Sequence, residues 1–240
     1  MLKAVFFDLD GTLLPFDEKE FVKIYFKLLY KKVYSYGYTD FNAFVNALNL
    51  GTVAMYKNDG SKTNETVFFE TFESLLGPIS DEAKKAFDDF YHNEFSETRI
   101  CFKKNEYAKE IVNFVKENVG KIVLATNPIF PYQATKSRLS FLNLEMSDFD
   151  LVSTYENFSY SKPNPMYFID ILNRLNLKPE EVIMFGNNDY EDYVCATKAG
   201  IKTYLIDGFV MKHDEMNINC EIIKMEEVID TIKKEICARQ

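Results

Sequence analysis

Hydrophobic and polar positions along the chain follow two different patterns. From residue 105 onward, short apolar runs typical of buried strands alternate with stretches in which apolar residues recur at helical spacing. The runs predicted to be strands are residues 4–7, 121–125, 149–152, 182–185 and 202–206, and a last helix is predicted over residues 226–236. Strands that alternate with helices predict an α/β fold, in which a Rossmann-like parallel sheet carries helices on both faces.

The stretch between residues 15 and 104 shows only the helical spacing, and it is too long for a simple connection within a compact domain. Its apolar and aromatic residues predict a helical bundle with its own core. The residues expected to begin its four helices are Asp17 with Glu20, Asp40, Asn64, and Ser80 or Asp81. The third helix is expected to stop at Gly77-Pro78 and the fourth at about Phe95. We therefore expect an α/β core of residues 1–14 and 105–240 and a helical domain of residues 15–104.

Composition narrows the class of protein. With 47% hydrophobic and 27% charged residues, the chain resembles an ordinary soluble globular protein. Its 37 acidic and 28 basic residues give a net charge of −9, which disfavours binding to nucleic acid or to an anionic membrane. No apolar run approaches the roughly 20 residues that span a bilayer, and no secretory signal is found. We expect a cytoplasmic protein, a monomer or weak homo-oligomer, whose four scattered cysteines are reduced.

Two carboxylates, Asp8 and Asp10, directly follow the first predicted strand. The C-terminal ends of the strands are where open α/β sheets bind their ligands. A tight turn at Gly11 allows the two side chains to converge. Like charges held close together repel unless a cation neutralises them or one of them is protonated. Mg²⁺ is the simplest such cation, because it prefers oxygen ligands.

Three later segments each place polar side chains after a predicted strand. Thr126, followed by Asn127, could bind a phosphoryl oxygen through its hydroxyl and the N–H groups of the turn. Lys162, held between a serine and a proline, could pair with both Asp8 and a phosphoryl group. The loop Gly186–Asp192 could complete a metal site. Each segment alone also has an ordinary explanation: a helix cap, a surface lysine and a capped loop.

Together the four segments resemble the four motifs of the haloacid dehalogenase superfamily, most of whose members are Mg²⁺-dependent phosphatases. Asp8-Leu9-Asp10-Gly11-Thr12 resembles the first motif, Thr126-Asn127 the second, Lys162 the third and Gly186–Asp192 the fourth. The resemblance covers the chain outside the helical insertion, which lies where the family carries its helical cap domain. It implies a Mg²⁺-dependent hydrolase of small phosphate monoesters, with a small phosphorylated metabolite as its substrate.

The resemblance also implies a role for each residue. Asp8 is expected to be the nucleophile that forms an aspartyl phosphate, and Asp10 the general acid and base. Thr126, Asn127 and Lys162 are expected to hold the phosphoryl group, and Lys162 also offsets the repulsion between nucleophile and ester. The residues expected to bind Mg²⁺ are Asp8, Asp10, Asn187 and Asp192.

The last motif departs from the family pattern. Many members have an acidic residue directly after its glycine or one place later, whereas here Asn187 and Asn188 occupy both positions. An amide oxygen can bind Mg²⁺ but adds no charge, so weaker metal binding is expected. Asn187 is expected to be the direct ligand and Asp192 its outer support, with Asn188 and Asp189 as competitors.

Several alternatives stay open at this point. A dehalogenase of the same family would need neither the proton from Asp10 nor a metal, and a phosphomutase would pass the phosphoryl group from Asp8 to a sugar hydroxyl. A binding or regulatory protein with a weakened metal site is a third alternative, suggested by the two asparagines. The substrate itself is expected to be selected by residues 15 to about 104, but the sequence does not tell which of these side chains face the site.

Overall fold

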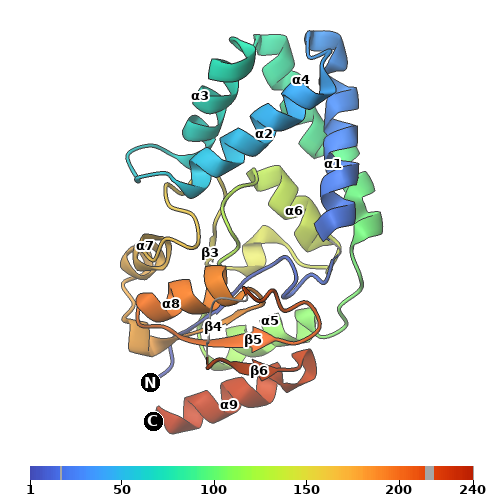
Figure 1. Ribbon diagram of the computed structural model, residues 1–240. Coiled ribbons are helices and arrows are strands. Elements are labelled where there is room, and N and C mark those ends of the chain that lie inside the picture. Colours follow the sequence, from blue (N-terminus) through green and yellow to red (C-terminus); the bar gives the residue numbers. More distant parts are fainter. Residues whose placement is uncertain (17, 214–218, 240) are drawn as a thin grey trace.

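The structure is a computed structural model and describes residues 1–16, 18–213 and 219–239. Its centre is a parallel sheet with the strand order β3-β2-β1-β4-β5-β6 (Figure 1). The strands are β1 (Ala4–Phe7), β2 (Lys121–Leu124), β3 (Leu151–Val152), β4 (Val182–Gly186), β5 (Lys202–Ile206) and β6 (Glu221–Ile223). All five predicted strands are present, although β3 is shorter than residues 149–152. The edge strand β6 was not predicted, because it has three residues of which only Ile223 is buried.

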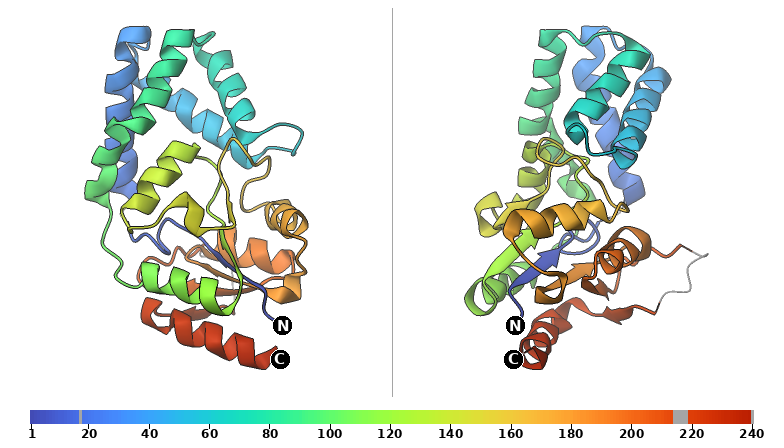
Figure 2. Two further views of the ribbon diagram at one scale, coloured as in Figure 1. Left: turned by 180° about the vertical axis from the view of Figure 1, so that it is seen from behind. Right: turned by 90° about the vertical axis from the view of Figure 1, so that its left-hand side faces the viewer.

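Helices cover both faces of the sheet, as the sequence predicts. On one face Val5 and Phe7 share a core with α5 (Ala108–Asn118) and α9 (Val228–Ala238). On the other, Ala4 and Phe6 of the same strand pack with two further helices (Figure 2). These are α7 (Met166–Leu175) and α8 (Cys195–Lys198). A strand buried on both faces has no solvated side, which is why β1 is apolar at all four positions.

The insertion forms a helical bundle, as predicted. Its elements are α1 (Glu18–Val33), α2 (Phe41–Tyr56), α3 (Asn64–Leu76), α4 (Asp81–His92) and the 3₁₀ segment Glu94–Cys101. Asp40 and Ser80 cap α2 and α4 by accepting hydrogen bonds from the N–H groups of Ala43 and Ala83, at 3.0 and 3.2 Å. Helix α3 begins at Asn64 as predicted, and Thr63 caps it. The predicted cap at Asp17 lies outside the described residues, and α4 ends at His92 rather than near Phe95.

Aromatic side chains form the core of the bundle. Phe44, Phe72, Phe90 and Phe95 are fully buried in one apolar cluster, which is distinct from the two clusters that flank the sheet. Aromatic rings bury large apolar areas, so a small bundle can be stabilised by a few of them. The prediction that most aromatic residues of the insertion serve as core is therefore confirmed for these four.

The bundle rests on the C-terminal edge of the sheet, and contacts on two sides hold it there. Helix α6 (Tyr132–Ser140), which follows β2, adds Ala134 to the apolar cluster of the bundle. At the other side, the buried Asn64 at the start of α3 donates hydrogen bonds to the carbonyl of Pro128 and to the hydroxyl of Ser161, both at 3.0 Å. The bundle is thus tied to two loops that follow strands. The division into domains at residues 14/15 and 104/105 stays a prediction.

The helices and the cysteines bear on two further expectations, the absence of a membrane span and the reduced state of the thiols. None of the helices in the described residues has the length and apolar content needed to cross a membrane. The four cysteines carry thiols and form no disulfide within the described part of the chain.

Candidate active site

The first motif forms a tight turn at the end of β1. The backbone N–H of Asp8 still donates to the carbonyl of Phe185 in β4, at 2.9 Å, and the chain then turns at Gly11, where φ is +81°. A Cβ atom at Gly11 would lie 2.2 Å from the amide nitrogen of Asn187. Glycine is therefore required for the backbone angle and for the close approach of the last motif.

Lys162 joins two of the predicted site residues. Its ammonium lies 2.8 Å from Oδ1 of Asp8 and 2.6 Å from Oδ1 of Asp192, and its side chain is only 1% exposed. Burial lowers the pKa of Lys162, but the attraction of Asp192 and Asp8 outweighs burial and keeps this pKa well above its usual value. The ammonium is therefore a permanent charge at the floor of the site, and the predicted pairing of Lys162 with Asp8 is found.

The negative charge of Asp8 is less fully neutralised by its neighbours. Burial raises the pKa of its carboxyl to about 7, Lys162 opposes the rise, and the charge of Asp192 adds to it. The second oxygen accepts a hydrogen bond from the hydroxyl of Thr12 at 3.2 Å. One ammonium thus serves two buried carboxylates, which leaves an excess of negative charge beside Asp8. Such an excess favours a bound cation.

Asp10 has a partner that the sequence did not reveal. The guanidinium of Arg138 on α6 forms an ion pair with Oδ2 of Asp10. The same guanidinium donates to the hydroxyl of Thr135 at 3.2 Å and lies 4.6 Å from the ring centroid of Phe130. Burial raises the pKa of Asp10, and Arg138 opposes that rise. Oδ1 of Asp10 is buried and has no hydrogen-bond partner among the described residues.

Nothing in the sequence around Arg138 distinguishes it from a surface arginine, because α6 is amphipathic only weakly and, besides Arg138, five of its nine residues are polar. Only its burial and its distant partner mark it as part of the site.

The last motif turns one side chain toward the first motif. Oδ1 of Asn187 lies 3.3 Å from the hydroxyl of Thr12, while its amide nitrogen donates to the carbonyl of Phe209 at 2.8 Å. The competing positions are otherwise engaged: Oδ1 of Asn188 accepts from two backbone N–H groups, and Asp189 pairs with His213. Of these three, Asn187 is the one whose side-chain oxygen lies within hydrogen-bond distance of the first motif.

Asp192, the last residue of this loop, holds the backbone at the beginning of the loop. Its Oδ2 accepts from the backbone N–H groups of Asn187 and Asn188, at 2.9 and 3.0 Å, and its Oδ1 accepts from Lys162. Both carboxylate oxygens are therefore satisfied by protein donors. This arrangement suits the outer support predicted for Asp192 better than a direct ligand, and its assignment as a ligand stays a prediction.

The donor atoms fit the magnesium that the resemblance implies. The carboxylates of Asp8 and Asp10 and the amide oxygen of Asn187 are hard oxygen donors, and Oδ1 of Asp10 lacks any other partner. No group of three or more His, Cys, Asp or Glu side chains in the described ranges could hold a metal. A third ligand taken from the predicted residues would be the neutral amide of Asn187, and the expected weakness of the site stays a prediction.

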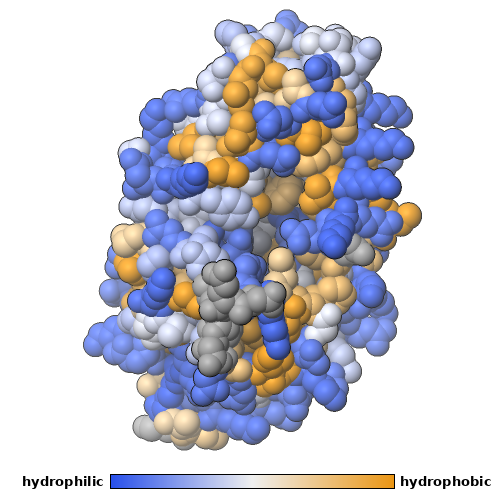
Figure 3. Space-filling view, in the orientation of Figure 1, coloured by the Kyte–Doolittle hydropathy of each residue, from blue (hydrophilic) through white to orange (hydrophobic). Residues whose placement is uncertain are grey.

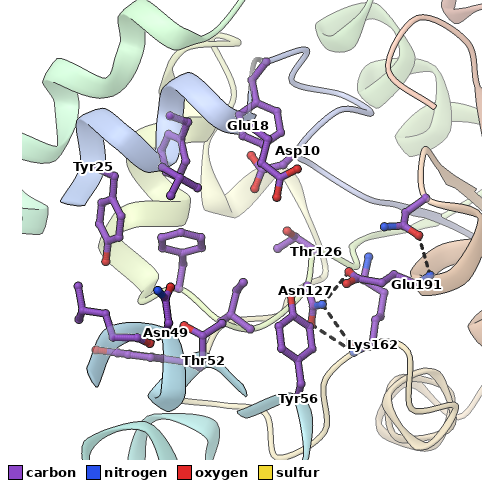
Figure 4. A pocket seen from close by; sticks show the side chains of 18 of the residues that line it. Asp10, Glu18, Tyr25, Asn49, Thr52, Tyr56, Thr126, Asn127, Lys162 and Glu191 are labelled. Carbon is purple, nitrogen blue, oxygen red and sulfur yellow. Dashed lines mark hydrogen bonds between the residues drawn. The ribbon is translucent and has the colours of Figure 1, made fainter. Parts of the chain in front are cut away.

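The second motif lies beside Lys162. Thr126 lines the cavity, and its backbone carbonyl accepts from the hydroxyls of Ser153 and Tyr167. Asn127 instead braces the third motif, because its side chain both accepts from and donates to the backbone of Lys162, at 3.2 Å each. It also donates to Glu191 at 2.8 Å (Figure 4). Phosphate binding by Thr126 and Asn127 stays a prediction, and the positioning role of Asn127 was missed.

All these motifs open into one cavity of about 290 Å³ between the bundle and the sheet. Its floor holds Asp8, Asp10, Thr126, Lys162 and Asn187, and its walls come mostly from the helical bundle. Figure 3 shows hydrophobic side chains on the bundle, above and around the recess between the two parts of the molecule. The geometry thus places two carboxylates, an ammonium and an amide oxygen together at the bottom of a partly enclosed pocket.

Comparison with known proteins points to one family. A family model described as haloacid dehalogenase-like hydrolase matches residues 5–206. The chain is 26% identical to a phosphorylated carbohydrates phosphatase from Thermotoga maritima, over 97% of this chain and 99% of that protein. It is 28% identical to a glyceraldehyde 3-phosphate phosphatase from Pyrococcus furiosus, over 84% of this chain and 79% of that protein. A 2-haloacid dehalogenase from Pseudomonas syringae shares the fold, with a TM-score of 0.66 and 16% identity over 98% and 99% of the two chains.

Proposed function

The chain belongs to the haloacid dehalogenase-like hydrolases, and from this premise we propose that it is a Mg²⁺-dependent phosphatase of small phosphate monoesters, acting through an aspartyl phosphate on Asp8. One observation carries the proposal: the carboxylate of Asp8 lies at the floor of the cavity, 2.8 Å from the buried ammonium of Lys162. A carboxylate so placed can approach an anionic ester, because the adjacent cation offsets the repulsion.

The reaction has two steps: Asp8 is first the nucleophile and then the leaving group, and Asp10 is first the general acid and then the general base. An oxygen of Asp8 attacks phosphorus, the bond from phosphorus to the ester oxygen breaks, and Asp10 protonates the departing alcohol. In the second step Asp10 takes a proton from water, the water oxygen bonds to phosphorus, and phosphate leaves with Asp8 restored. The ion pair with Arg138 holds the Asp10 carboxylate in place for both transfers.

The other residues bind and orient. Lys162 neutralises the transferred phosphoryl group, Thr126 donates its hydroxyl to a phosphoryl oxygen, and Asn127 fixes the backbone of Lys162. Mg²⁺, held by Asp8, Asp10 and Asn187, would supply positive charge to the phosphoryl oxygens. The cytoplasmic location and the monomeric or weakly oligomeric state expected from the sequence remain predictions.

A phosphatase assay with Asp8→Asn as control tests the proposal. The wild-type protein with millimolar Mg²⁺ is expected to release phosphate from small esters such as p-nitrophenyl phosphate, and the variant is expected to release none. Equal rates for both proteins would rule out Asp8 as the nucleophile. Release of halide from a 2-haloacid, or transfer of phosphate to a sugar without release, would favour the dehalogenase or the phosphomutase. Absence of both Mg²⁺ binding and turnover would favour a binding protein.

A further inference from the structure

The walls of the cavity above Asp8 are mostly aromatic. Phe21 and Tyr25 come from α1, Phe68 and Phe69 from α3, and Phe130 from the loop after β2. The hydroxyls of Tyr25 and Tyr91 form a hydrogen bond with each other at 2.7 Å, so these two tyrosines present chiefly the faces and edges of their rings to the cavity. A leaving group that enters this space exchanges water for apolar carbon, which is favourable only when the leaving group is itself apolar.

Cationic side chains are almost absent from the cavity. Among the described residues that line it, Lys162 is the only lysine or arginine, and its ammonium already serves two carboxylates. Arg138 lies behind Phe130 and is paired with Asp10. The side chains of Glu18 and Glu191 also line the cavity and are acidic (Figure 4). A second phosphate or carboxylate on the substrate would therefore be buried near negative charge without a cation to neutralise it.

Away from the floor, the neutral hydrogen-bonding side chains that line the cavity are three residues of α2 and the tyrosines Tyr25, Tyr91 and Tyr155. Asn49, Thr52 and Tyr56 follow one another at helical spacing along α2 and face the cavity (Figure 4). The hydroxyl of Thr52 already donates to the carbonyl of Leu48 at 3.0 Å. This stripe can orient a leaving group with one or two polar atoms. It cannot satisfy the several hydroxyls of a sugar, which would face aromatic rings on the other walls.

We propose that the substrate is a phosphate monoester whose leaving group is uncharged and predominantly apolar, an aryl or short alkyl alcohol, and that esters with a second anionic group are rejected. This inference rests on the proposed phosphatase function and specifies its substrate class. It differs from the carbohydrate and glyceraldehyde phosphates in the names of two relatives. The leaving group must fit in a cavity of about 290 Å³, so it can be no larger than a single ring or a chain of similar size.

A series of n-alkyl phosphates tests the proposal, because the pKa of the alcohol barely changes along the series and only apolar area grows. From ethyl to hexyl phosphate, kcat/KM is expected to rise about threefold per methylene. Glucose 6-phosphate adds hydroxyls and 6-phosphonooxyhexanoate adds a carboxylate. For both, kcat/KM is expected to be at least about 10-fold lower than for hexyl phosphate. A flat alkyl series, or a preference for either polar ester, would overturn the proposal.

A pair of lysine substitutions provides the matched control. Val22 lines the cavity and is 37% exposed, whereas Val53, also in the bundle and 40% exposed, does not line it. Val22→Lys is expected to improve the ratio of kcat/KM for 6-phosphonooxyhexanoate over hexyl phosphate by about 10-fold, since it adds the missing cation. Val53→Lys is expected to leave that ratio unchanged. Equal ratios in the two variants would contradict the electrostatic part of the inference.

The test separates this inference from the proposed function. Turnover of p-nitrophenyl phosphate together with a flat alkyl series would overturn the substrate class and leave the phosphatase function standing. If no ester is hydrolysed, the phosphatase function fails, and calorimetric titration with ethyl-, butyl- and hexylphosphonate still reports on the cavity. Affinity that rises with chain length supports the apolar site in that case, and affinity independent of chain length overturns it.

Discussion

Arg138 binds one oxygen of Asp10 and leaves the other without a partner. The guanidinium pairs with Oδ2, while Oδ1 is buried, belongs to a residue that lines the cavity, and has no hydrogen-bond partner in the described part of the chain. The two residues stand 128 positions apart in the sequence. The arrangement fixes the orientation of a carboxylate and keeps one oxygen available for a proton or a metal, which makes Arg138 a positioning residue.

Replacing Arg138 by methionine is expected to shift the pH dependence of turnover. Arg138 opposes the rise in the pKa of Asp10 that burial causes, so its removal raises this pKa further. The limb of the pH–rate profile that reports ionisation of Asp10 should move to higher pH, and stability above that pKa should fall by about 3–5 kcal/mol. Steady-state kinetics from pH 5 to 9 and urea denaturation measure both effects.

The conservative variant Arg138→Lys keeps the charge and is expected to retain part of the wild-type pH profile. In the background of Asp10→Asn, Arg138→Met should have no further effect on the profile. A profile that is unchanged in Arg138→Met itself, despite lower stability, would mean that Arg138 acts only in packing.

Asp8→Asn is expected to stabilise the metal-free protein at high pH. Burial raises the pKa of Asp8 from 3.8 to about 7 in the folded protein. The folded state therefore binds more protons than the unfolded state between these values, and stability falls as the pH rises through them. Above pH 7 the variant should gain on the order of 2 kcal/mol over the wild type. The gain should vanish near pH 4.

Thermal denaturation with a chelator present, at pH 4.5 and pH 8, measures this difference. Asp207→Asn serves as control, because Asp207 is exposed and an asparagine can still accept from the N–H of Gly208. A stability difference between Asp8→Asn and wild type that is the same at both pH values would show that ionisation of Asp8 is not its cause.

Asn187→Asp is expected to strengthen Mg²⁺ binding and to weaken the metal-free fold. The new carboxylate adds charge at the predicted ligand position, for which about a 10-fold gain in affinity is expected. The same change replaces the amide donor that now binds the carbonyl of Phe209, at a cost of about 1–3 kcal/mol. Isothermal titration with Mg²⁺ and denaturation with a chelator measure the two effects separately.

Asn188→Asp is the matched control for this change. Oδ1 of Asn188 accepts from the backbone of Tyr190 and Glu191, and an aspartate can keep both bonds. Asn188→Asp is expected to change the Mg²⁺ affinity less than Asn187→Asp does. If Asn188→Asp strengthens binding more than Asn187→Asp does, the ligand assignment is wrong and Asn188 takes the place of Asn187.

Asn64→Ala is expected to loosen the bundle from the sheet. The buried side chain bridges α3 to Pro128 and Ser161 and accepts a hydrogen bond from Asn58 at 2.8 Å. Its removal leaves buried polar groups without partners, for a loss of about 2–3 kcal/mol. Amide hydrogen exchange should quicken at the start of α3 and in the loop after β2. Asn46→Ala, at an exposed position of α2, should change neither.

Local patterns in the sequence were sufficient for five of the six strands, for the helices of the bundle and for part of the site. The apolar run before Asp8 predicts a strand that is buried on both faces, and the structure has it at residues 4–7. Asp40 and Ser80 cap helices because their side chains reach N–H groups three residues ahead, which is a local geometry. Asp8 and Lys162 meet because loops that follow strands of a parallel sheet gather at the same edge.

The tertiary structure decided what depends on distant partners. The burial of Arg138 against Asp10, the contact of Asn187 with Thr12, and the aromatic walls above Asp8 all follow from how α6, the last loop and the bundle pack. Helical spacing says which residues share a face of a helix, but it does not say what lies opposite that face. Partners far apart in the chain come together only through packing, so the sequence by itself determined the four motif segments, and the fold decided which side chains surround them.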